Sequence, residues 1–157
     1  MPESTADLSD EFENGLQYCE LSFQQYGRRA SFSGVITTVQ CFQDIGLLRS
    51  VLQTSGAGRV LVVDGGGSTR TALLGDTMAQ LAINSGWSGL VINGVVRDTR
   101  ALAQMDIGIK ALGSSPRRGG RAGAGRKNVA VMFGGVVFRP AARLVSDEDG
   151  VIVLDPQ

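Results

Sequence analysis

Two short polar stretches carry residue types that could bind and polarise a small carboxylic acid. One is Gly75-Asp76-Thr77-Met78, at the start of a predicted helix, and the other is Arg97-Asp98. The first backbone N–H groups of a helix lack internal partners and can bind a carboxylate, which the small Gly75 would let approach closely. Arg97 offers a planar guanidinium that suits a carboxylate, and Asp98 offers a hard oxygen ligand for Mg²⁺.

Each stretch has a plainer interpretation when it is taken alone. Asp76 could simply cap a helix, and Arg97-Asp98 could be an exposed ion pair or a second helix cap. Both stretches, however, follow apolar strands and open helices. In an α/β sheet the carboxyl ends of neighbouring strands form a natural ligand crevice. We therefore expect a helix N-terminus, one arginine and one aspartate to meet there around a small 2-oxo acid.

The absence of histidine narrows the chemistry further. It removes the commonest general base and the commonest transition-metal ligand. A Ser-His-Asp triad is excluded, and so is a zinc hydrolase site. Any metal must be held by oxygen, which favours Mg²⁺ or Mn²⁺.

Charge and length restrict the possible partners. Lys plus Arg and Asp plus Glu number 15 each, and this balance argues against direct nucleic-acid binding or attachment to a membrane surface. The arginine-rich stretch 117–127 contains no aromatic residue on which bases could stack, so we interpret it as a solvated loop or a subunit contact. No apolar run spans a bilayer, and residues 1–13 do not resemble a signal peptide. A cytoplasmic location is expected.

The elements that must position these residues alternate between strands and helices. Helices are predicted over 5–12, after Asp44 as a cap, after Asp76 as a cap, and over 97–102. Strands are predicted over 31–42, 59–63, 71–74, 89–93, 107–112, 129–138 and 151–154, with an acidic segment at 147–150 that is either a turn or a metal site. This order predicts a single α/β domain over residues 1–157, with a mixed sheet flanked by helices.

Four sequence blocks resemble a known family. They are Val62-Val63-Asp64-Gly65-Gly66-Gly67, Leu74-Gly75-Asp76, Asn93-Gly94-Val95-Val96-Arg97-Asp98 and Asp106-Ile107-Gly108-Ile109-Lys110-Ala111-Leu112-Gly113. They are similar to the successive signatures of the regulator of ribonuclease activity A and the metal-dependent 4-hydroxy-4-methyl-2-oxoglutarate aldolases. The resemblance runs from about Cys41 to Val153. It implies a swivelling β/β/α domain in a ring-shaped homotrimer.

The same resemblance implies roles for individual residues. Gly75, Asp76, Thr77, Met78 and Arg97 would bind the substrate, Arg97 and Asp76 would be catalytic, and Asp98 would hold a divalent cation, Mg²⁺ or Mn²⁺. The implied reactions are retro-aldol cleavage of 4-hydroxy-4-methyl-2-oxoglutarate and decarboxylation of oxaloacetate. Both release pyruvate through an enolate.

The alternative implied by the resemblance is a non-catalytic regulator that binds and masks an RNA-degrading endoribonuclease. Enzymatic members carry an acidic residue three positions after the aspartate of the Arg-Asp pair, where this chain has Ala101. Long aldolases also contribute a glutamate from an extra C-terminal segment. Regulator-type members lack both acids, so ligand binding is better supported than efficient turnover.

Overall fold

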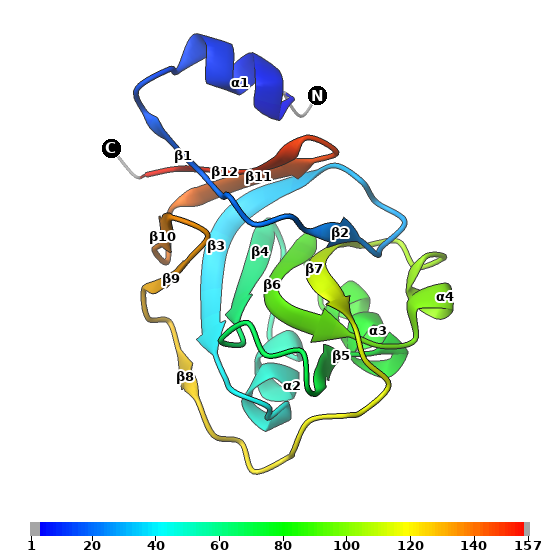
Figure 1. Cartoon of the computed structure of the whole chain (residues 1–157). Coiled ribbons are helices and arrows are strands. Elements are labelled where there is room, and N and C mark those ends of the chain that lie inside the picture. Colours follow the sequence, from blue (N-terminus) through cyan, green and yellow to red (C-terminus); the bar gives the residue numbers. More distant parts are fainter. Residues whose placement is uncertain (1–3, 156–157) are drawn as a thin grey trace.

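A mixed sheet of ten strands forms the centre of the protein. Figure 1 shows its arrangement in the computed structural model, which describes residues 4–155. The helices in this part of the chain are α1 (Thr5–Glu11), α2 (Gly46–Leu52), α3 (Asp76–Asn84) and α4 (Thr99–Leu102). The strands are β1 (Leu16–Tyr18), β2 (Gln24–Gln25), β3 (Phe32–Gln40), β4 (Arg59–Asp64), β5 (Ala72–Leu74), β6 (Gly89–Val96), β7 (Gly108–Ser114), β8 (Arg126–Lys127), β9 (Val131–Phe133), β10 (Val136–Phe138), β11 (Arg143–Asp147) and β12 (Gly150–Leu154).

The middle of the sheet is parallel and its flanks are antiparallel. The strand order is β1-β12-β11-β3-β4-β6-β7-β2, with β5 paired to β6 and β8 paired to β3. Strands β3, β4, β6 and β7 run in the same direction, so their carboxyl ends lie along one edge. Because α3 follows β5 and α4 follows β6, the starts of both helices lie at that edge.

Strand β4 shows why the central strands read as unbroken apolar runs. Leu61 and Val63 belong to a core that also contains residues of α2 and α3, whereas Val60 and Val62 belong to a second core beneath the β9–β10 hairpin. All four side chains are buried. A strand covered on both faces has no solvent side and therefore needs no polar alternation.

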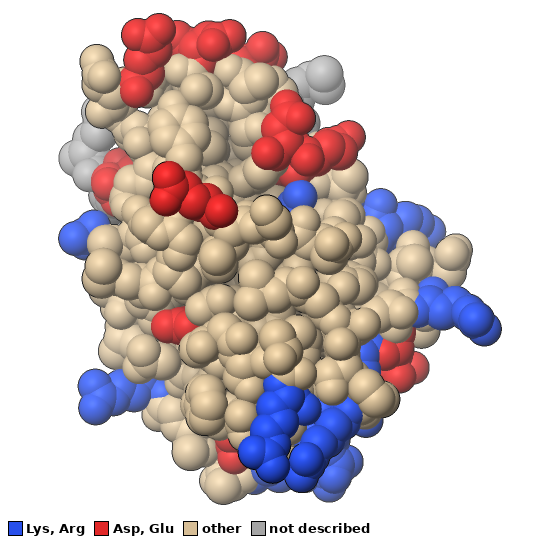
Figure 2. Space-filling view, viewed as in Figure 1, with Lys and Arg blue, Asp and Glu red and all other residues tan. Residues whose placement is uncertain are grey.

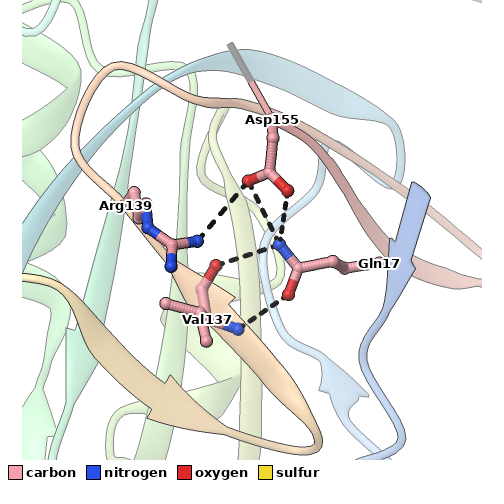
Figure 3. A network of polar contacts seen from close by, with 4 residues as sticks. All are labelled: Gln17, Val137, Arg139 and Asp155. Atoms are coloured by element: carbon pink, nitrogen blue, oxygen red, sulfur yellow. Dashed lines mark hydrogen bonds and ion pairs between the residues drawn. The ribbon is translucent and has the colours of Figure 1, made fainter. Parts of the chain in front are cut away.

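The two ends of the described chain are joined to each other. Strand β1 pairs with β12, and the Asp147 carboxylate accepts hydrogen bonds from the backbone N–H (2.8 Å) and hydroxyl (2.7 Å) of Thr5. Figure 3 shows a second tie, in which the Gln17 side chain bonds the backbone of Val137 and the carboxylate of Asp155. Arg139 approaches the same carboxylate at 3.9 Å. These contacts fix α1 and β1 to the far end of the sequence.

The predicted elements are largely confirmed, with corrections at the helix starts and at residues 129–138, where the one predicted strand is a hairpin of β9 and β10. Neither Asp44 nor Asp76 is an N-cap: α2 has Ile45 and α3 has Gly75 in that position. The short strands β1, β2 and β8, and the longer β11, were not predicted. The predicted domain also includes residues 1–3 and 156–157, which lie outside the described residues. Over residues 4–155, no helix has the length and apolar character needed to cross a membrane.

Candidate functional site

A cavity of about 520 Å³ lies at the carboxyl edge of the central strands. The six residues singled out from the sequence all line it, namely Gly75, Asp76, Thr77, Met78, Arg97 and Asp98. The rest of the lining is Ile45, Gly46, Arg49, Ala72, Leu73, Leu74, Arg118 and Arg121. The structure therefore brings together two stretches that are separated by eighteen residues of sequence.

The first turn of α3 forms one wall, and its N–H groups are partly occupied by aspartates. The Asp76 N–H donates to Asp98 Oδ2 at 3.0 Å, and the Thr77 N–H donates to Asp76 Oδ1 at 2.7 Å. The first helical bond runs from Ala79 N–H to Gly75 O at 3.0 Å. The N–H of Met78 has no side-chain acceptor among residues 4–155, so it is free for a ligand in this arrangement.

Asp98 is held tightly against this turn in an uncommon backbone conformation. Its φ of 57° and ψ of 40° lie in the left-handed region, which a non-glycine residue occupies only when its surroundings hold it there. A Cβ added to Gly75 would lie 2.6 Å from Asp98 Oδ2. Glycine at position 75 is therefore what allows the Asp98 carboxylate to sit against the helix start.

The electrostatics favour a charged Asp98. The pKa of its carboxyl lies below the usual range, first because of the hydrogen bond from the Asp76 backbone N–H and further because of the positive charge of Arg97. An ionised carboxylate is the form that binds a hard cation.

Arg97 enters the cavity from the end of β6. Its backbone N–H donates to Leu74 O at 2.9 Å, which ties β6 to the chain just before α3. Its Nη1 donates to Pro116 O at 3.5 Å. No carboxylate of the described residues lies within 4.0 Å of this guanidinium, so the alternative of an exposed ion pair is not what the fold contains. The other alternative holds for position alone: Asp98 is the N-cap residue of α4, but its side chain makes no capping hydrogen bond.

The residues present fit a magnesium-type cation better than a metal enclosed by protein. Residues 4–155 contain no group of three or more histidine, cysteine, aspartate or glutamate side chains that could hold a metal. Mg²⁺ commonly uses one or two carboxylates and fills its other positions with water and substrate oxygens. Asp98, next to Asp76 and open to the cavity, meets that description.

The cavity lining also contains three arginines that we did not single out from the sequence as site residues. Arg118 and Arg121 belong to the stretch interpreted above as a solvated loop or subunit contact, and Arg49 lies in the last turn of α2. Their arrangement depends on Asp44, which is far away in sequence from the loop it fixes. The arginine-rich sequence does not indicate that Asp44 fixes this loop, so the position of the loop at the cavity could only be seen in the tertiary structure.

Asp44 is a buried carboxylate that fixes this loop to the start of α2. It accepts backbone hydrogen bonds from Gly46 (2.9 Å), Ala122 (2.8 Å) and Gly123 (3.0 Å). Burial raises the pKa of Asp44, but these bonds together outweigh burial and leave the pKa below its usual range. A carboxylate held in this way is a structural anchor.

The acidic segment after β11 is a turn. The Asp147 carboxylate is used by Thr5 and by the backbone N–H of Asp149, at 3.0 Å. No metal-holding group of acidic residues forms there within the described chain.

Comparison with known proteins places these features in context. A family model described as RraA-like, Aldolase/RraA, matches residues 5–153. A crystal structure described as an S-adenosylmethionine: 2-dimethylmenaquinone methyltransferase from Geobacillus kaustophilus is 46% identical, with a TM-score of 0.96 over 99% of this chain and 96% of that one. The RNA-processing inhibitor RraA from Thermus thermophilus is 42% identical, with a TM-score of 0.95 over 100% and 96%.

A more distant match is also described as an RraA-type protein. Streptomyces coelicolor RraAS2, described as an unusual member of the RNase ES inhibitor RraA protein family, is 25% identical, with a TM-score of 0.82 over 98% of this chain and 81% of that one. The fold class expected from the sequence is confirmed by these matches.

Proposed function

The chain belongs to the RraA-like family, and from this premise we propose that it is a divalent-metal-dependent lyase acting on 2-oxo acids. The proposed reactions are aldol cleavage of 4-hydroxy-4-methyl-2-oxoglutarate and decarboxylation of oxaloacetate. The observation that carries the proposal is the joint placement of the α3 start, Arg97 and Asp98 around one cavity. The family contains proteins described as aldolases and proteins described as inhibitors, so the activity itself is the step we propose.

The start of α3 and Arg97 would bind the shared end of both substrates. The positive end of the helix and the free Met78 N–H suit the carboxylate next to the 2-oxo group. In both reactions the C3–C4 bond breaks and its electron pair becomes the enolate of pyruvate. The Arg97 guanidinium, which has no ion-pair partner among residues 4–155, can stabilise that negative charge as it develops.

The two carboxylates of the cavity take different parts. Asp98 would hold Mg²⁺ or Mn²⁺, which when bound supplies Lewis-acid polarisation of the 2-oxo group. In aldol cleavage Asp76, the second carboxylate in the lining, is the proposed group that takes the proton of the 4-hydroxyl and later returns a proton to C3. In decarboxylation no hydroxyl is deprotonated, and the proton that C3 gains comes from water. In aldol cleavage the products are then two molecules of pyruvate, and in decarboxylation they are pyruvate and CO₂.

The test is a pyruvate-release assay on both 2-oxo acids, with Mg²⁺, with Mn²⁺ and after exhaustive chelation. We expect release that depends on the cation and returns when the cation is restored. Asp98→Asn should abolish the response to cation while the melting temperature stays close to wild type, because an exposed side chain adds little to the core. Full activity after chelation would refute the metal-dependent mechanism.

A second candidate function is a non-catalytic inhibitor of an RNA-degrading endoribonuclease. Two observations favour it: Ala101 stands where enzymatic members carry an acid, and a 42% identical protein is described as an RNA-processing inhibitor. If neither 2-oxo acid yields pyruvate, inhibition of a purified endoribonuclease becomes the deciding measurement.

A methyltransferase function has less support in this chain. Glycine-rich loops that bind nucleotide-like cofactors connect a strand to a helix N-terminus. Here the Gly65-Gly66-Gly67 turn connects β4 to β5, which is another strand.

We expect a cytoplasmic homotrimer, as the family resemblance implies, with no direct contact to nucleic acid or membrane.

A further inference from the structure

The walls of the cavity carry more positive charge than the proposed reaction needs. Four arginines line it, from α2 (Arg49), from the end of β6 (Arg97), and from the segment after β7 (Arg118 and Arg121). The lining contains two carboxylates, Asp76 and Asp98. Four positive charges minus two negative charges leave a net of two before any cation binds.

Three of these arginines have a guanidinium group with no ion-pair or hydrogen-bond partner among residues 4–155. The ion pairs between described residues involve Arg28, Arg29 and Arg139, none of which lies in the cavity. Within residues 4–155, the guanidinium groups of Arg49, Arg118 and Arg121 make no hydrogen bond. Their combined charge is therefore available to a ligand.

The segment that carries two of them is fixed rather than loose. On one side, the Ala72 N–H donates to Arg117 O at 2.6 Å and the Gly119 N–H donates to Ala72 O at 3.2 Å. On the other side, the Asp44 carboxylate holds the N–H groups of Ala122 and Gly123. The backbone that bears Arg118 and Arg121 is thus tied to β5 and to the start of α2, and a preorganised site loses less entropy when it binds.

We propose that Arg49, Arg118 and Arg121 form a second anion subsite, which binds the carboxylate at the far end of a dicarboxylic 2-oxo acid. This inference rests on the proposed function, in which α3 and Arg97 hold the near end. Guanidinium groups suit carboxylates because their N–H donors match the carboxylate oxygens. A cavity of about 520 Å³ is in the range of sites that enclose whole small molecules, so there is room beyond a pyruvate unit. The subsite selects dicarboxylic over monocarboxylic 2-oxo acids.

The experiment compares two ligands of equal carbon number, 2-oxoglutarate and 2-oxopentanoate, by calorimetric titration in the presence of Mg²⁺. They share the 2-oxo acid end, and only the former has a distal carboxylate. The wild type is expected to bind 2-oxoglutarate about tenfold to a hundredfold more tightly, as charge-assisted hydrogen bonds allow. In the triple variant Arg49→Gln, Arg118→Gln, Arg121→Gln, this preference should fall to about threefold or less.

The matched control removes the same total charge outside the cavity, with Arg59→Gln, Arg100→Gln and Arg143→Gln, which are all exposed arginines. This variant should keep most of the preference, whereas a general field effect would lower it equally in both triple variants and would overturn the proposal. Equal binding of both ligands by the wild type, binding of neither, or a preference that survives in the cavity variant would also overturn it.

Binding is measured without turnover, so the two proposals can fail separately. An arginine-dependent preference in a protein that releases no pyruvate would refute the lyase and leave the subsite standing. Pyruvate release without any preference would do the reverse.

Discussion

At the scale of single residues, the site depends on one hydrogen bond at the start of α3. The Asp76 N–H donates to the Asp98 carboxylate, and Asp98 itself has a left-handed backbone conformation. Such a conformation costs on the order of 1–3 kcal/mol for a residue other than glycine, and surrounding contacts must offset it. The strain is located at the proposed cation ligand, next to the arginine that would stabilise the enolate.

Arg97→Lys tests whether the guanidinium geometry matters. Lysine keeps the positive charge but loses bidentate binding, so we expect the catalytic efficiency to fall about tenfold to a thousandfold, or roughly 1.4 to 4 kcal/mol. Stability should change by less than about 1 kcal/mol, because Arg97 has no ion pair among the described residues. Steady-state kinetics and a thermal melt on the same sample separate the two effects. An early melt with normal turnover would make Arg97 a structural residue.

Gly75→Ala tests the close approach of Asp98 to the helix. The backbone φ of −132° at this position is open to alanine, but the new Cβ would lie 2.6 Å from Asp98 Oδ2. We expect the carboxylate to be displaced and the Mg²⁺ concentration for half-maximal activity to rise about tenfold or more, a shift of roughly 1.4 kcal/mol. Cation titration of the activity provides the measurement.

The control is Gly113→Ala in β7, where the added Cβ would meet only Val95 Cγ1, at 3.9 Å. That is an ordinary van der Waals distance, so the cation requirement should stay as in the wild type. A similar loss in both variants would mean that Gly75 matters for the fold and not for Asp98.

At the scale of elements, the Asp44 carboxylate joins two segments of the chain that are not paired as neighbouring strands. Asp44 serves the start of α2 and the segment after residue 119 at once, and the Ile45 N–H adds a bond to Gly120 O at 2.8 Å. The position of the cavity wall is therefore set by a buried charge with several donors.

Asp44→Asn should destabilise the protein by about 1–3 kcal/mol, because an amide nitrogen would face backbone N–H donors that lose their acceptor. The variant should also change the pH dependence. The folded-state pKa of Asp44 is depressed, so its contribution is present above the unfolded value of about 3.9 and is lost as pH falls through the folded pKa. In thermal melts from pH 7 to pH 3, the stability difference between wild type and variant should therefore shrink toward the acid end.

The exposed Asp10 of α1, which has no side-chain hydrogen bond among the described residues, supplies the control for that series. Asp10→Asn should shift stability by less than about 0.5 kcal/mol. A difference between wild type and Asp44→Asn that does not shrink below pH 4 would show that the ionised Asp44 is not the anchor.

The sequence predicted the central elements well because their signals are local. Continuous apolar runs identify β4 and β6, and the residues after the strands identify the first wall of the cavity. Strands β1, β2 and β8 are two or three residues long, which leaves no periodicity to detect. The arginine wall was missed for a different reason: its composition is that of a solvated loop, and only the long-range contact with Asp44 fixes it on the cavity.

At the scale of the whole molecule, the net charge is zero, but acidic and basic side chains gather at opposite ends. Figure 2 shows acidic side chains over the end of the molecule where α1 lies and basic side chains at the opposite end, near α2. The exposed acids of the first end include Asp7, Asp10 and Glu11, and the exposed cations of the second include Arg49, Arg118 and Arg121. The cavity therefore opens where the local potential attracts anions, even though composition alone suggested no preference.

Assembly is the prediction that belongs to this scale. We expect a homotrimer of about 50 kDa, three times the 16.5 kDa chain, or a dimer of such trimers. Two large apolar side chains, Phe42 and Met132, are 64% and 72% exposed in the isolated chain and are candidates for coverage in the assembly. Light scattering at micromolar concentration provides the measurement, and a 16.5 kDa particle would contradict the expectation.

The pairing of β1 with β12 has a consequence for how the chain folds during synthesis. Leu16 is opposite Leu154, and Thr5 is bonded to Asp147, so the first helix and strand have no native partner until nearly all of the chain has left the ribosome. Strands β3, β4, β6 and β7 can pair much earlier, since they lie close together in sequence. Contacts between distant segments slow folding. Until β11 and β12 have been synthesised, the segment that becomes α1 therefore has no packing partner, and a piece this short is not expected to be helical on its own.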